Sequence, residues 1–118
     1  MVWNESLSRI KSNADSASKL KGRLDTEKIA VMGQSCGGLQ ALEVSGDPRI
    51  KTTVLLNSGV FKGDQKLPGL TVTKETLKSL HAPIAYFIGG PSDISYPNAI
   101  DNFALIQGVP AFLGMRAP

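Results

Sequence analysis

The fold of this chain is decided by the stretch KIAVMGQSCGG, residues 28–38. An apolar run leads up to Gly33, and Ser35 follows it among small residues. The next six residues, LQALEV at 39–44, are suited to a helix. Apolar residues before a glycine-rich turn and a helix-compatible segment after it predict the order strand, tight turn, helix.

Three residues of this stretch, Gly33, Ser35 and Gly37, form the pattern G-x-S-x-G, which is typical of a nucleophile elbow. The serine of such an elbow occupies a strained turn, so that its hydroxyl projects from the end of the sheet. Glycine at the two flanking positions is expected to avoid collisions with the neighbouring strand and helix. The helix start directs unpaired N–H groups at a bound ligand. We therefore expect the Cys36 amide to be one donor to a developing oxyanion.

The pattern by itself is short enough to occur by chance. The alternative is a glycine-rich turn in another parallel α/β domain that binds an anion at the helix N-terminus. The sequence contains neither G-x-x-x-x-G-K-[ST] nor G-x-G-x-x-G, the two common phosphate-binding patterns. The strand expected before Ser35 and the helix expected after it favour the elbow.

Composition indicates one globular domain and gives no sign of nucleic-acid binding. The 118 residues are 42% hydrophobic and 19% charged, as in folded proteins. The net charge is +3, and the basic residues are spread along the chain rather than clustered. No transmembrane run, signal peptide or metal-ligand cluster is visible, and we expect no cofactor. The single cysteine cannot form an internal disulfide, and the compartment is not predicted.

Beyond the elbow, strands alternate with helices. This alternation predicts an α/β fold with a short, mainly parallel sheet of about four strands and helices on both faces, in three layers. Ligands bind beyond the carboxyl ends of such strands, where Ser35, residues 57–59 and residues 89–93 should collect. Pro110 indicates that the last strand is an edge. We expect strands at 28–32, 52–57, 83–88 and 109–114, and helices at 2–12, 36–45, 73–80 and from Pro97 onward.

With these motifs, the chain resembles the C-terminal half of an α/β-hydrolase. The nearest branch is that of esterases similar to dienelactone hydrolases, platelet-activating-factor acetylhydrolases and polyester hydrolases. The resemblance rests on residues 33–38, 53–59 and 84–93. It implies a serine ester hydrolase that forms an acyl-enzyme on Ser35 from a small-molecule ester. The family's triad acid follows the strand after the next one, a position held here by Asp93; alternatively, Asp93 caps a helix or closes an Asx-turn.

The chain departs from the family pattern in two places. The family's catalytic histidine follows the last strand, where this chain ends, so the catalytic triad is incomplete. The only histidine, His81, stands just before a strand and is expected at the opposite end of the sheet from Ser35. The family also has strands before the elbow, with a loop that supplies the second oxyanion donor. We therefore interpret residues 1–118 as one partial, truncated domain.

Three hypotheses about function remain. The first is a serine esterase that is impaired because its base is absent, since an unassisted serine hydroxyl is a poor nucleophile. The second is a non-catalytic α/β-hydrolase remnant, and the third is a small anion-binding α/β module. Whether the chain is an enzyme therefore stays open. The strand at 28–32 should also lack one neighbour, which predicts marginal stability and self-association through that edge.

Overall fold

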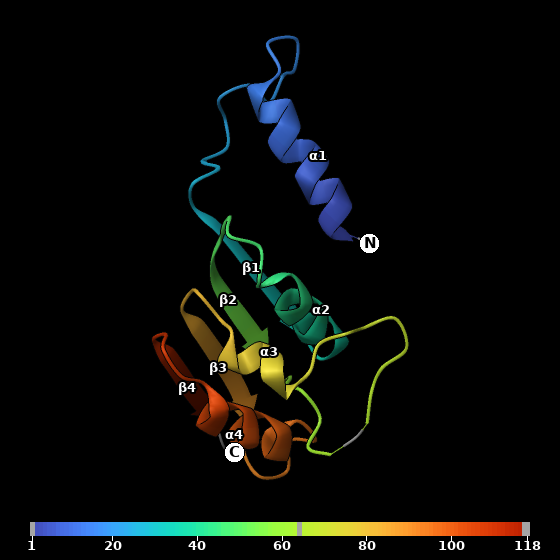
Figure 1. The fold of residues 1–118 in the computed structure, drawn as a ribbon, viewed down its shortest axis with the longest axis vertical. Coiled ribbons are helices and arrows are strands. Elements are labelled where there is room, and N and C mark those ends of the chain that lie inside the picture. Colours follow the sequence, from blue (N-terminus) through green and yellow to red (C-terminus); the bar gives the residue numbers. More distant parts are fainter. Residues whose placement is uncertain (1, 64, 117–118) are drawn as a thin grey trace.

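The computed structural model describes residues 2–63 and 65–116. From the first strand onward, strands and helices alternate along the chain (Figure 1). Each expected strand and helix is found, with ends that differ by a few residues. The elements are α1 (Val2–Ala14), β1 (Ile29–Gln34), α2 (Cys36–Val44), β2 (Ile50–Leu56), α3 (Lys74–Lys78), β3 (Ile84–Gly89), α4 (Tyr96–Leu105) and β4 (Ala111–Arg116).

The four strands form one parallel sheet in the order β1-β2-β3-β4. Consecutive strands are neighbours, as short right-handed crossovers favour. In the register, Gln34 lies opposite Leu56, Leu56 opposite Phe87, and Phe87 opposite Gly114. The carboxyl ends of all four strands therefore meet at one rim of the sheet. The predicted α/β class and the parallel sheet are confirmed, and β4 is an edge strand that begins directly after Pro110.

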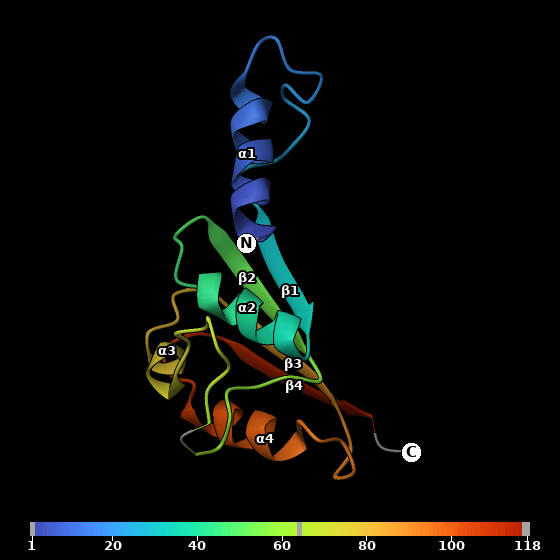
Figure 2. The ribbon, with the colours of Figure 1, turned by 90° about the vertical axis from the view of Figure 1, so that its right-hand side faces the viewer.

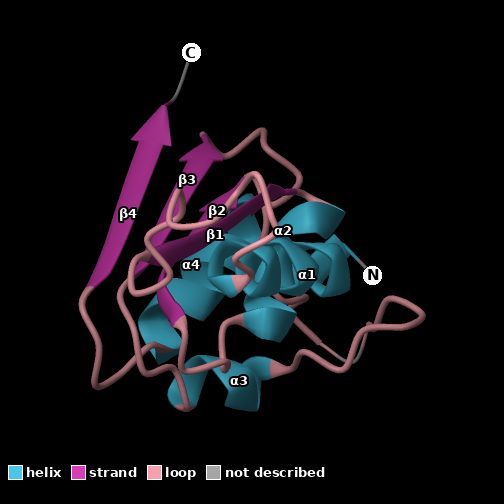
Figure 3. Cartoon of the chain, turned by 90° about the horizontal axis from the view of Figure 1, so that it is seen from above, coloured by secondary structure: helices cyan, strands magenta, loops and turns pink. Residues whose placement is uncertain are grey.

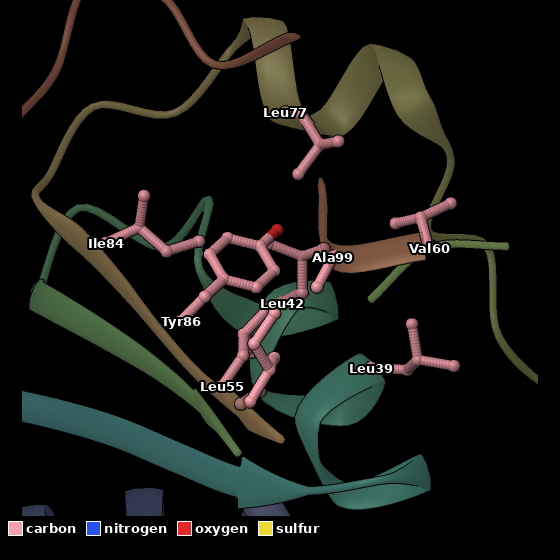
Figure 4. Close-up of a cluster of buried hydrophobic side chains, with 10 residues drawn as sticks. Leu39, Leu42, Leu55, Val60, Leu77, Ile84, Tyr86 and Ala99 are labelled. Carbon is pink, nitrogen blue, oxygen red and sulfur yellow. The ribbon is translucent and has the colours of Figure 1, made fainter. Parts of the chain in front are cut away.

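One face of the sheet packs against α2, α3 and α4, which lie together on the same side (Figure 3). The core between them is built from alternate residues of β2 and β3 and from the inner sides of the helices. Figure 4 shows Tyr86 among these side chains, with its ring directed from β3 toward the helices. The cluster contains Leu39, Ala41, Leu42, Leu55, Val60, Leu77, Ile84, Tyr86, Ile88 and Ala99.

The opposite face of the sheet, called here the open face, carries exposed apolar side chains. Met32 of β1 is 67% exposed, and Phe87 and Phe112 of β3 and β4 are also exposed. Phe87 and Phe112 contact each other, with ring centroids 5.6 Å apart. The expected second helical layer is therefore not found among residues 2–63 and 65–116, which form two layers instead of three. Strand alternation alone does not fix the face on which each crossover helix packs.

The first helix stands beyond the amino-terminal end of β1, away from the core (Figures 1 and 2). Asn13 holds the loop that returns the chain to the sheet. Its side chain accepts a hydrogen bond from the Leu24 amide at 2.8 Å and donates one to the Leu24 carbonyl at 3.1 Å. The described residues include no helix that is both long and apolar enough to span a membrane.

Candidate active site

Ser35 forms the whole connection between β1 and α2, and its backbone is strained. It has φ 52° and ψ −120°, a region that residues with a Cβ atom rarely adopt. Its amide donates to the Leu56 carbonyl of the neighbouring strand at 3.0 Å, and its carbonyl accepts from the Gly38 amide at 3.0 Å. The expected sharp strand-to-helix turn is therefore present, and its backbone is tied to both β2 and α2.

The two elbow glycines meet different surroundings. A Cβ atom added at Gly33 would lie 2.0 Å from the carbonyl oxygen of Gly37, so only glycine fits there. A Cβ atom added at Gly37 would have no described atom within 4 Å. The expected collision is therefore found at Gly33, whereas the same explanation for Gly37 is wrong. Gly37 instead lines a groove beside the outer edge of β1.

The side chain of Ser35 is exposed and is not used to cap α2. The amides of Gly38 and Leu39 donate to the Ser35 carbonyl, at 3.0 and 3.4 Å. The Cys36 amide precedes them in the first turn, where a helix leaves its N–H groups without intrahelical partners. The Cys36 thiol is exposed as well. The turn thus places an exposed serine at the carboxyl end of β1, directly before the N-terminus of α2.

Asp93 lies beyond the end of β3, at the same rim of the sheet as Ser35. Its Oδ1 accepts hydrogen bonds from the Ser95 amide at 2.9 Å and the Ser95 hydroxyl at 2.8 Å. Its Oδ2 accepts from the Gly89 amide at 2.8 Å. The hydrogen bonds to Asp93 lower its pKa from 3.8 to about 2, although burial acts in the opposite direction. The bond from the Ser95 amide lowers the pKa most, and the bond from the Asn57 side chain comes next. The carboxylate is therefore ionised at neutral pH.

Asn57 lies between Ser35 and Asp93, because β2 separates β1 from β3. It directly follows β2 with φ 44°, and asparagine is one of the few residues that tolerate this left-handed conformation. Its Nδ2 donates to Asp93 Oδ2 at 2.5 Å. Sequence reasoning placed residue 57 at the rim without giving it a role. The available signal was an asparagine directly after a buried parallel strand.

The contacts of Asp93 match the alternative in which this residue closes an Asx-turn. The bond from the Ser95 amide to Asp93 Oδ1 has the spacing of an Asx-turn. With the Ser95 hydroxyl, the Gly89 amide and Asn57, the carboxylate accepts four hydrogen bonds. A carboxylate has about four acceptor positions. An imidazole that bonds to Asp93 would therefore replace one of these donors, of which the exposed Asn57 side chain is the most accessible.

His81 lies far from this rim, as the sequence predicts. Its Nε2 atom is 3.0 Å from the carbonyl oxygen of Ile50, the first residue of β2. Ser35 contacts the last residue of the same strand, Leu56. Because β2 runs the full length of the sheet between these two points, His81 is at the opposite end. The described residues contain no group of three or more His, Cys, Asp or Glu placed to hold a metal ion.

The sequence matches no protein-family model and no curated protein. The structure is similar to that of a dienelactone hydrolase from Anabaena variabilis ATCC 29413, with a TM-score of 0.62 and 16% identity. That match covers 93% of this chain and 44% of the dienelactone hydrolase. The chain has the fold of part of an α/β-hydrolase.

A second similar structure is the esterase domain of a Rhodothermus marinus protein, with a TM-score of 0.56 and 16% identity. The match covers 73% of this chain and 47% of that domain. The chain thus spans less than half the length of either α/β-hydrolase structure. At this identity the likeness concerns the fold, which agrees with the resemblance inferred from the sequence.

The lowered pKa of Asp93 predicts a loss of stability in acid. A carboxyl whose pKa is lower in the folded state stabilises the fold above its unfolded pKa, and this contribution disappears as the pH falls. The native chain should therefore lose stability between pH 3.8 and about 2. Asp93→Asn should lower the stability at pH 7 by about 1–3 kcal/mol, because an NH₂ group cannot accept from the Gly89 amide. The variant should also lose less stability on acidification.

Urea unfolding measured from pH 7 down to pH 2 checks this expectation. Asp47→Asn is the matched control, since hydrogen bonds from Arg49 also lower the pKa of Asp47 to about 2. Each single variant should keep the acid dependence that the other aspartate contributes. Equal pH profiles for the native chain and Asp93→Asn would show that the rim does not hold the carboxylate in this way.

Proposed function

We propose that this chain is the nucleophile-bearing part of a serine ester hydrolase, in which Ser35 attacks a carboxylic ester. The observation that supports this proposal most strongly is the strained turn at Ser35. This turn places an exposed serine beside a helix N-terminus at the carboxyl rim of the sheet. The similar structures support this reading at the coarse level, because one is named a dienelactone hydrolase and the other an esterase domain.

In the proposed reaction, Ser35 Oγ bonds to the acyl carbon while a base takes the hydroxyl proton. The Cys36 amide donates to the oxyanion that forms. When the tetrahedral intermediate collapses, the alcohol leaves with a proton returned by the base, and the acyl group remains on Ser35. Water then releases the acid by the same two steps. Asp93 would orient the base and stabilise its protonated form.

The base is the missing component. His81, the only histidine of the 118 residues, lies at the opposite end of β2. The four hydrogen bonds to Asp93 also leave the rim stable without an imidazole. We therefore expect the chain alone to turn over esters slowly, while Ser35 remains accessible to a reactive probe. A non-catalytic remnant, or an anion-binding module, is the second candidate.

A fluorophosphonate probe tests the proposal directly. Ser35 should be labelled slowly, and the adduct should be located on Ser35 by peptide mass spectrometry. Ser35→Ala should abolish the labelling, and His81→Ala should leave its rate unchanged. Absence of labelling in the native folded chain would favour the non-catalytic alternative, and loss of labelling in His81→Ala would show that the base is inside the chain.

We also propose that the chain self-associates through the β1 edge and the open face. Within residues 2–63 and 65–116, β1 pairs with β2 and with no other strand. Its outer side borders a groove of ≈ 770 Å³ that is lined by apolar residues such as Leu24 and Val44 and by charged residues such as Arg9 and Lys28. An unpaired strand edge is a template for another strand, and the same edge on two copies can pair about a two-fold axis.

A charge placed on β1 should weaken this association, because charged edge strands resist pairing. Met32→Lys introduces such a charge on the open face. Ile94→Lys is the control, since Ile94 is 93% exposed and lies in the loop after β3, outside the sheet. Sedimentation velocity should show a concentration-dependent oligomer for the native chain and Ile94→Lys, and a shift toward monomer for Met32→Lys. A native chain that stays monomeric at every concentration would contradict the proposal.

A further inference from the structure

We infer that Ser58 is a positioning residue for the turn that carries Ser35, and that α4 holds Ser58 in place through Asn102. The importance of this contact for reactivity rests on the proposed function, in which Ser35 is the nucleophile. The contact itself is independent of that proposal. It joins three segments that are far apart in sequence: the elbow, the loop after β2, and the last helix.

The contact at the turn is a hydrogen bond from Ser58 Oγ to the carbonyl oxygen of Ser35, at 2.6 Å. Ser58 is 3% exposed, so water does not compete for this carbonyl from the Ser58 side. Gly38 makes the approach possible. A Cβ atom added at Gly38 would lie 2.4 Å from Ser58 Oγ, a distance that real side chains do not show. This close approach explains why residue 38 is a glycine, although it lies outside the G-x-S-x-G pattern.

The turn needs such a contact because its conformation is unfavourable by itself. A residue with a Cβ atom at positive φ costs on the order of 1–3 kcal/mol and persists where the surroundings hold it in place. The Ser35 amide is held by the Leu56 carbonyl of β2, and the Ser35 carbonyl is held by Ser58 Oγ. Both peptide groups of Ser35 are thus fixed by β2 and by the loop that follows it.

Ser58 is itself fixed by the packing of the next two residues on α4. A Cβ atom added at Gly59 would lie 3.1 Å from the backbone nitrogen of Ala99, so the loop backbone lies directly on the helix. Asn102 then binds Val60 at both of its peptide groups. Its Oδ1 accepts from the Val60 amide at 2.6 Å, and its Nδ2 donates to the Val60 carbonyl at 2.8 Å.

Asn102 is suited to this task because it is completely buried and both its amide oxygen and its amide nitrogen hydrogen-bond to Val60. The Tyr86 hydroxyl also donates to Asn102 Oδ1, at 3.4 Å. An unpaired amide in this position would cost the fold free energy, so Asn102 and the loop stabilise one another. The path from α4 to Ser35 therefore runs through the buried Asn102–Val60 hydrogen bonds, along the chain to Ser58, and through the Ser58–Ser35 hydrogen bond.

The alternative is that Ser58 only satisfies a buried carbonyl and contributes to stability in general. Ser45 provides a matched control for this alternative. It is 2% exposed, and its hydroxyl donates to the Leu42 carbonyl at 2.6 Å at the other end of α2. Ser45→Ala and Ser58→Ala therefore remove the same kind of bond from the two ends of one helix, and only the second bond reaches the elbow.

Amide hydrogen exchange measured by NMR separates the two roles. After correction for the change in global stability, Ser58→Ala should accelerate exchange of the Ser35 amide roughly tenfold, the effect of about one lost hydrogen bond. Ser45→Ala should leave the corrected rate unchanged, and Asn102→Ala should act in the same direction as Ser58→Ala. Equal corrected rates at Ser35 in Ser58→Ala and Ser45→Ala would overturn the inference. If Ser58→Ala does not fold, Ser58→Cys keeps a side chain of similar shape with a weaker donor.

Fluorophosphonate labelling of the same variants distinguishes this inference from the proposed function. If both hold, Ser58→Ala should be labelled roughly tenfold more slowly than Ser45→Ala. Faster exchange at Ser35 in a chain whose native form is never labelled would uphold the positioning role and refute the nucleophile. A labelling rate that is equal in Ser58→Ala and Ser45→Ala would show that the contact does not serve reactivity.

Discussion

The candidate site depends on the close approach of two backbone segments, the end of β1 and the start of α2. At Gly33 this approach leaves no room for a side chain, because the Gly37 carbonyl lies where a Cβ atom would be. The chain must reverse within the few residues between these glycines, and Ser35 takes the positive φ that the reversal requires. The exposed hydroxyl and the adjoining helix N-terminus are consequences of this one constraint.

The polar residues at the rim follow from the same register. Parallel pairing brings Ser35, Asn57 and Asp93 to the carboxyl ends of three adjacent strands. Two of the three, Ser35 and Asn57, have positive φ, and hydrogen bonds from the adjoining strands or loops hold both in place. Ser35 and Asn57 are therefore strained, Asp93 is held by hydrogen bonds, and a parallel sheet supports all three. Residues that must stay in a fixed geometry are commonly held in this way.

Much of this arrangement could be predicted from the sequence because it depends on local patterns. Apolar runs and glycines predicted β1, the turn at Ser35 and α2, and parallel strand order predicted that Asp93 would share their rim. The contacts of Ser58 and Asn102 could not be predicted from local patterns. Ser58 bonds to Ser35, which lies 23 positions away, and Asn102 bonds to Val60, which lies 42 positions away, so both contacts depend on how distant segments pack. The open face and the clear space at Gly37 were missed for the same reason, since both depend on what packs against them.

The most direct test of the central constraint compares the free energies of unfolding of Gly33→Ala and Gly37→Ala. The structure predicts different effects on stability from the same substitution at two positions that are four residues apart. Gly33→Ala should destabilise the chain by about 1–3 kcal/mol or more, because the new methyl group overlaps the Gly37 carbonyl. Gly37→Ala should be neutral or stabilising by up to about 1 kcal/mol, because alanine favours the helix and meets no described atom. Equal destabilisation by both substitutions, or a larger loss at Gly37, would contradict this account of the turn.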